Sequence, residues 1–293
     1  MKKFIAIATA ILLSAALILS LGACGDDSDE EESTVESSAA VYTPDIPVST
    51  ADIISYYNGI IAFVCDDSNF DSTAPAVEPD RSFSVSSIVV TESGETETSS
   101  RLESLQNAST QIKNLILTDL PTSDMIPDTI EYGAGSIADT IGNAADYELT
   151  MDDVVSAEFY QYGEIYYISI YIESEDDTVA NVFNAVDTDA IYEEFTTAEE
   201  YAVLNSFTAT YIDQDDRTIY NADNPDNITC CLIYLEVEAE TGYVQYLAYT
   251  RAVYIEADVT GTGAFEDYGD FEVHFRFTDV LSFTFDWDEP TDE

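Results

Sequence analysis

The second half of the chain is dominated by runs in which β-branched and aromatic residues alternate with other residues. The runs cover about 206–213, 228–239, 243–258 and 270–286, and glycine, asparagine and aspartate separate them. Alternation of this kind, bounded by turn residues, is typical of β-strands. Turn signals occur at 241–242 and 261–263. The stretch 206–286 therefore predicts an antiparallel meander.

Further strands are predicted earlier in the chain. Phe83, Val85, Ile88 and Val90 indicate a strand within about 82–92. Gly163 separates two alternating runs, which predicts a hairpin. The runs of this hairpin cover 154–162 and 164–173.

Helical spacing is present in three segments. Apolar residues recur every three or four positions over 49–65, where Ser49 or Thr50 can cap the helix, and over 101–118. The segment 189–204 also favours a helix. Together these elements predict an α+β fold, in which a curved antiparallel sheet packs against one or two helices, the first of them at 49–65.

The N-terminus has the pattern of an export signal. Lys2 and Lys3 precede an apolar run over residues 4–21, which ends in Gly22, Ala23 and Cys24. This run is short and cleanly ended, which is typical of a secretory signal and not of a spanning helix. The last residues resemble the lipobox of bacterial lipoproteins. The resemblance implies cleavage before Cys24, a lipid on that cysteine, and a place on the extracytoplasmic face of the cell membrane.

The sequence therefore predicts three regions: a signal peptide at 1–23, an acidic disordered tether at 24–41 and a single domain at 42–293. Like charges extend such a tether. Loss of 1–23 removes two lysines and no acidic residue, so the formal net charge changes from −51 to −53. This charge repels phosphate backbones and argues against nucleic-acid partners. With 46% hydrophobic residues, the body of the chain is nevertheless expected to fold.

Three cysteines remain if Cys24 carries a lipid. They are Cys65, Cys230 and Cys231. One disulfide with one free thiol, or three free thiols, are both open. Cys65 and Cys231 are predicted to point toward the core, so either buried thiols or a Cys65–Cys231 disulfide is expected. Neighbouring cysteines on a strand point to opposite faces, which argues against a shared zinc site.

The other candidate chemistry rests on one histidine and many carboxylates. His274 could act as a general base oriented by Glu272, but a solvated row of charged side chains across the strands is the stronger interpretation, because no nucleophile motif is present. Acidic clusters occur at 173–177, 213–216 and 223–226, and the run at 213–216 lacks the glycine and the distal glutamate of an EF-hand loop. We therefore predict no enzyme activity, no metal site and no cofactor, with calcium at the acidic loops as the weaker alternative.

The 20 tyrosines are the most suggestive feature of the predicted domain. Tyrosine combines an apolar ring with a polar tip, which suits sugar stacking, an amphiphile pocket or a protein interface. Tyr167, Tyr171, Tyr246 and Tyr254 are the candidate ligand-binding residues. The competing interpretation is that tyrosine is simply a good strand former.

Residues 51–58, 119–121, 152–171 and 243–284 resemble a group of uncharacterised acidic lipoproteins from gut-type Gram-positive bacteria (Firmicutes, Clostridia). That family has a lipobox, an acidic linker, an early helix and a tyrosine- and threonine-rich sheet, and its helix runs into a lysine-containing segment. This chain has Cys65-Asp66-Asp67 at that place. The layout also resembles, more loosely, half-barrel lipoproteins of the LolA and LppX kind. No activity follows from either resemblance.

Two functions compete on these grounds. The first is a non-enzymatic, membrane-anchored binding or interaction module for a protein, glycan or lipid ligand. The second is a carrier that encloses a hydrophobic ligand between helix 49–65 and a concave sheet. An extracellular hydrolase is a minor third alternative.

Overall fold

The structure is a computed structural model that describes residues 41–70, 73–91, 107, 110, 126–172, 182, 202–212 and 230–287. The chain divides into two units, Met1–Glu36 and Ser37–Glu293, and all the described residues belong to the second. The predicted helix at 101–118 lies outside the described residues except for positions 107 and 110, which are helical.

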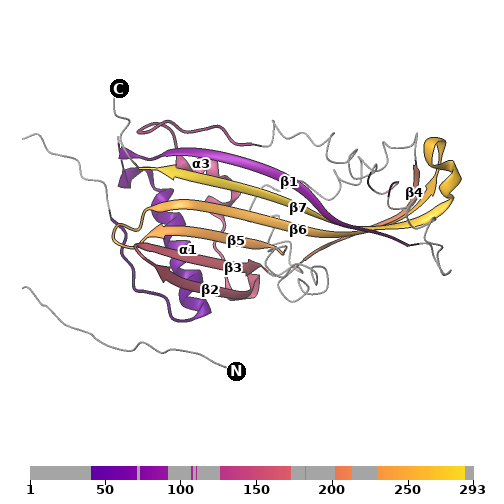
Figure 1. Cartoon of the computed structure of the whole chain (residues 1–293). Helices are drawn as coiled ribbons and strands as arrows, with labels where there is room; N and C mark the ends of the chain where they lie inside the picture. The colour runs from indigo at the N-terminus through magenta and orange to yellow at the C-terminus, as the bar shows by residue number, and fades with distance from the viewer. Residues whose placement is uncertain are drawn as a thin grey trace, which may run out of the picture. The chain divides into compact units, whose positions relative to one another are not determined.

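The fold is α+β, as predicted, with a curved and unclosed antiparallel sheet of seven strands (Figure 1). The sheet order is β1-β7-β6-β5-β3-β2, and β4 pairs with β6 away from this path. The strands are β1 (Ala76–Thr91), β2 (Val154–Tyr162), β3 (Ile165–Ile172), β4 (Ala202–Tyr211), β5 (Leu232–Glu238), β6 (Val244–Gly261) and β7 (Asp270–Asp286).

Strands β5, β6 and β7 form the predicted meander, but β4 does not join it next to β5. Instead, β4 and β5 lie end to end along the same side of β6: Leu232 of β5 pairs with Thr250, and Tyr211 of β4 pairs with Val253. Both strands fit along β6 because β6 has 18 residues, whereas β5 has only 7. Figure 1 shows β6 and β7 twisting beyond β5 toward the end where β4 lies.

Two other strand predictions differ from the structure only at their ends. The hairpin of β2 and β3 is confirmed, and Gly163 in its turn has a φ of 64°. Strand β1 begins at Ala76, before the predicted start at 82, and includes Pro79. Proline is tolerated there because β1 is the edge strand of the sheet order. The predicted helix at 189–204 lies outside the described residues as far as 201, and its last three positions belong to β4, which begins at Ala202.

The predicted first helix is confirmed as α1 (Thr50–Val64). Ser49 caps it, because its side-chain oxygen accepts a hydrogen bond from the backbone N–H of Asp52 at 3.2 Å. The short helices are η1 (Asp67–Asn69), α3 (Ile137–Ile141), α4 (Asn143–Asp146), η4 (Met151–Asp153) and η6 (Gly263–Tyr268).

Helix α1 packs directly on one face of the sheet. Its inward side chains share one core with β3, β5, β6 and β7; they are Ile53, Ile54, Tyr56, Tyr57, Ile60, Ile61 and Val64. The hydroxyls of Tyr57 and Tyr249 hydrogen-bond across this layer at 3.0 Å. Ile60 and Leu247 are fully buried in the same core, so side chains of α1 and of the sheet pack together in this layer.

The start of the described chain is fixed against the turn between β5 and β6. The N–H of Tyr42 donates to the carbonyl of Thr241 at 2.8 Å. Gly242 adopts a φ of 77°, and a Cβ placed on it would lie 1.9 Å from the carbonyl oxygen of Tyr42. Glycine is therefore required at this position by both conformation and contact.

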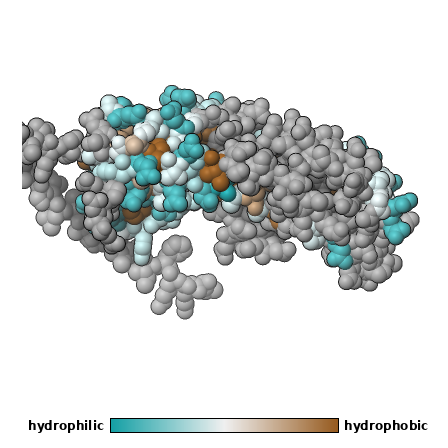
Figure 2. Space-filling model, turned by 90° about the horizontal axis from the view of Figure 1, so that it is seen from above, coloured by the Kyte–Doolittle hydropathy of each residue, from teal (hydrophilic) through white to brown (hydrophobic). Residues whose placement is uncertain are grey.

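Seen from above, the described surface is mostly hydrophilic or intermediate in hydropathy, with small hydrophobic patches (Figure 2).

Candidate functional site

Tyrosines gather on the sheet face that α1 leaves uncovered. Alternation along β3 sends Ile168 and Ile170 into the core beneath α1 and Tyr167 to the other side. The same alternation applies to β2, β5 and β6. We call this surface the tyrosine face and define it by Tyr160, Tyr162, Tyr167, Tyr234 and Tyr246 together with Glu158 and Glu236.

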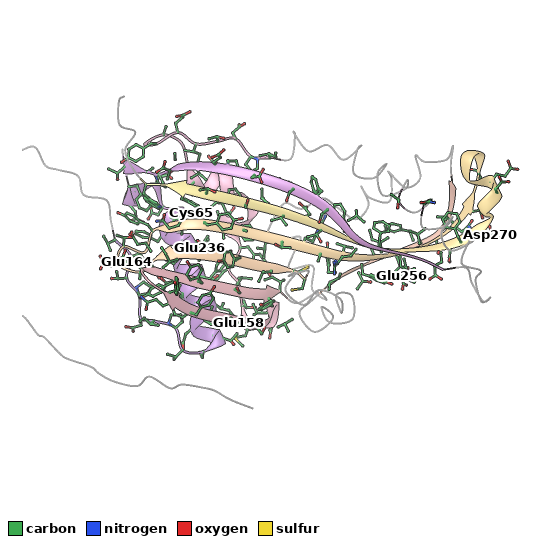
Figure 3. The ribbon with its side chains drawn as sticks, viewed as in Figure 1. Cys65, Glu158, Glu164, Glu236, Glu256 and Asp270 are labelled. Carbon is green, nitrogen blue, oxygen red and sulfur yellow. The ribbon has the colours of Figure 1, made fainter. Side chains whose placement is uncertain are left out.

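Four of these residues form one row across four strands. Tyr160 on β2 pairs with Tyr167 on β3, Tyr167 with Glu236 on β5, and Glu236 with Tyr246 on β6. Neighbouring strands lie about 4.8 Å apart, so the row is about 14 Å long. It places one carboxylate between aromatic side chains on both sides, and Figure 3 labels Glu236 on β5.

Ring contacts join four tyrosines of the face in two pairs. The rings of Tyr160 and Tyr167 stack with centroids 4.9 Å apart and planes at 8°. The ring of Tyr234 lies 6.1 Å from that of Tyr246, edge to face. Such pairs stabilise an aromatic surface beyond its area burial. The face is therefore a packed layer of rings whose orientations are set by their neighbours.

Burial, hydrogen bonding and charge raise the pKa of two tyrosines of the face, Tyr234 and Tyr167. The hydroxyl of Tyr234 donates to Oε1 of Glu236 at 2.7 Å. Burial, and then this bond and the charge of Glu236, raise the pKa of Tyr234. The pKa of Tyr167 is also raised, first by desolvation and then by Glu236 and its tyrosine neighbours. The hydroxyls of Tyr234 and Tyr167 therefore keep their protons to a higher pH than the hydroxyl of an ordinary exposed tyrosine.

The face is accessible at its β2 edge. Tyr162 is 77% exposed and Tyr160 is 53% exposed, whereas Tyr167, Tyr234 and Tyr246 are half-buried. The geometry can support stacking, cation–π contacts and hydrogen bonds to hydroxyls or amines.

The four tyrosines predicted to bind a ligand separate into two groups. Tyr167 and Tyr246 belong to the tyrosine face. Tyr171 does not contribute, because it is only 4% exposed and packs in a small cluster where β4 and β5 meet. Tyr254 lies farther along β6 and contacts His274.

His274 lies beside acidic side chains on its own strand and on the paired strand, and its side chain is 19% exposed. Its Nε2 hydrogen-bonds Oε1 of Glu272, and its Nδ1 lies 3.9 Å from Oε1 of Glu256 on the paired strand. The hydroxyl of Tyr254 lies 2.7 Å from Nδ1. Both ring nitrogens of His274 are therefore engaged by neighbouring side chains.

Sequence reasoning missed a buried charge cluster on the apolar face. Asp279 is fully buried and receives two hydrogen bonds from Arg81, from Nε at 2.9 Å and from Nη2 at 2.7 Å. Arg251 pairs with Asp279 across the strands, with its Nη2 4.0 Å from Oδ2. Within the described ranges, Nε and Nη2 of Arg251 have no hydrogen-bond partner.

The cysteine prediction had left two states open, and the structure has the free-thiol state. Cys65, Cys230 and Cys231 are free thiols, so the Cys65–Cys231 disulfide is not formed. Both of these cysteines contact the core, as predicted. Burial is the main cause that raises the pKa of each thiol to about 12.

The acidic clusters considered for calcium lie outside the described residues. Of the clusters at 173–177, 213–216 and 223–226, no residue is described, and neither is Cys24. Within the ranges that are described, no group of three or more His, Cys, Asp or Glu side chains is placed to hold a metal ion.

Tyr160, Tyr162, Tyr234 and Glu236 were not among the predicted site residues. The signal for Tyr160 was present in the sequence, because counting outward from the turn at Gly163 places it opposite Tyr167. Counting from a turn could not predict that Glu236 lies opposite Tyr167, because 68 residues separate the two in the sequence.

No described helix is both long and apolar enough to cross a membrane. No protein-family model matches the chain, and neither a curated protein nor a solved structure matches it.

Proposed function

We propose that this protein is an exported, lipid-anchored binding module whose tyrosine face holds the ligand. The observation that carries the proposal is the row of Tyr160, Tyr167, Glu236 and Tyr246 on the sheet face opposite α1. The export signal and Cys24 supply the anchor, and two acyl chains suffice for stable membrane attachment. An acidic tether would hold the domain away from the membrane.

A hydrophobic carrier would need space between α1 and the sheet. Tyr57 and Tyr249 hydrogen-bond across that layer, and the side chains around them are buried. The tyrosine face is therefore the better candidate.

Site-specific photocrosslinking in the cell that makes the protein tests the binding face. A benzoylphenylalanine replaces Tyr162, which is 77% exposed, and in a matched control it replaces Glu148, which is exposed beside α1. We expect an adduct of higher mass at position 162 and none at 148. Equal adducts at both positions, or none at either, would count against a binding face.

Fractionation tests the anchor separately. The wild-type protein is expected in the membrane fraction and the Cys24→Ala variant in the soluble extracytoplasmic fraction. A variant that remains with the membrane would show that Cys24 is not the anchor.

A further inference from the structure

The charge of the tyrosine face points to one class of ligand. We propose that it binds a basic polypeptide segment, whose lysine or arginine side chains contact the tyrosine rings and Glu236. This inference rests on the proposed function and names the ligand class of the same face.

The first argument is the sign of the available charge. The described residues include three Lys or Arg positions, namely Arg81, Arg251 and Arg276. All three are buried, with exposures of 7%, 1% and 2%. Within the part of the chain that the structure describes, the surface therefore offers exposed carboxylates and no exposed Lys or Arg. An anionic ligand would be repelled, whereas a basic one would be attracted from a distance.

The second argument is the local chemistry of the row. Glu236 lies between Tyr167 and Tyr246 in the register, and the hydroxyl of Tyr234 holds its Oε1. An ammonium or guanidinium group binds favourably over a tyrosine ring and beside a carboxylate. Because Glu236 has a tyrosine on each neighbouring strand, one basic side chain can contact a ring and Glu236 together.

The third argument is shape. The face is exposed along its β2 edge, where Tyr160 and Tyr162 are more than half exposed and Glu158 is also exposed. A single small cation on such a surface stays hydrated and gains little. A polypeptide with several basic side chains engages the rings and the carboxylates Glu158 and Glu236 at once, so its contacts add. A linear basic segment therefore fits this face better than a small amine.

The test must separate this face from the general attraction of a polyanion for polycations. The purified protein is titrated with a peptide rich in lysine and arginine, with an acidic peptide of equal length, and with a neutral oligosaccharide. The variants are Tyr167→Ala with Glu236→Gln, and as a control of equal charge change, Glu148→Gln beside α1. Circular dichroism of each variant verifies that it is folded.

We expect the protein to bind the basic peptide, and this binding to weaken as the salt concentration rises. The affinity for the peptide should fall about tenfold in the face variant and less than twofold in the control variant. Equal losses in both variants would show diffuse attraction and overturn the inference. If the wild-type protein bound only the oligosaccharide and the face variant did not, the inference of a basic ligand would be overturned. The proposal that the tyrosine face is a binding site would stand. Failure of the crosslink at Tyr162 is the separate result that removes the face itself.

Discussion

The buried charge cluster predicts that two arginines beside the same aspartate contribute to stability with different magnitudes. Asp279 has no exposure and lies on the sheet face shared with Phe277 and Leu281, which are also buried. Arg81 donates to both of its oxygens, whereas Arg251 approaches one oxygen only to 4.0 Å. Methionine has nearly the length of arginine without the charge, so it is the appropriate replacement at both positions.

Arg81→Met leaves the carboxylate of Asp279 buried without its two hydrogen bonds. Breaking a buried pair in this way costs about 3 to 5 kcal/mol. For a domain of this size each kcal/mol shifts Tm by about 2 to 4 °C, so Tm should fall by about 6 to 20 °C. Asp279→Asn should be similarly harmful, because it leaves guanidinium groups without their counter-charge.

Arg251→Met should behave differently. Among the residues that the structure describes, its Nε and Nη2 lack hydrogen-bond partners, so the native state already carries that desolvation cost. Its ring contact with Tyr211, 5.8 Å from Cζ to centroid, is the main interaction lost. We expect the free energy of unfolding to stay within about 1 kcal/mol of wild type or to rise.

Urea unfolding followed by circular dichroism measures all three variants, and equal m-values would show that the same surface is exposed in each case. A loss in Arg251→Met as large as that in Arg81→Met would refute the reasoning, since it would mean that the 4.0 Å pair contributes as much as the bidentate one.

Two further predictions concern the α1 side of the sheet and the thiols. The side chain of Asn58 donates to the carbonyl of Leu149 at 2.8 Å and accepts from its N–H at 3.1 Å. Asn58→Asp should therefore cost about 1 to 3 kcal/mol at pH 7 but less below pH 4, where a protonated carboxyl can donate again; urea titrations at both pH values test this. Burial raises the pKa of the Cys231 thiol to about 12. Because the unfolded thiol releases its proton near pH 8.5, the unfolded state binds fewer protons above that pH, and stability should fall by about 1.4 kcal/mol per pH unit until about pH 12. The difference in unfolding free energy between wild type and Cys231→Ala, measured from pH 8 to 10.5, should show this slope; a constant difference would contradict it.

Local patterns predicted the elements well and their arrangement only partly. The helix α1 follows from apolar spacing and the Ser49 cap, and the β2–β3 hairpin follows from the turn at Gly163. Nothing local indicates that β4 continues the line of β5 along β6. That arrangement buries Tyr171 while it leaves Tyr167, four residues earlier on the same side of β3, half-buried on the tyrosine face. Alternation along a strand predicts on which face of the sheet a side chain lies. It does not predict which other elements pack against that face.

Long-range pairing explains why the charged residues were the hardest to predict. Arg81 and Asp279 are 198 residues apart in sequence, and a chain with 59 acidic residues offers many other partners. The pairing arises because β1 lies beside β7 in the sheet order. This pairing also affects the surface. The three described arginines are buried, and one of them, Arg81, pairs with Asp279 at 2.7 Å. Among the described residues, the exposed carboxylates therefore have no exposed arginine or lysine beside them. The negative face that would attract a basic partner and the buried cluster that should stabilise the sheet thus have one origin, the burial of the few described arginines.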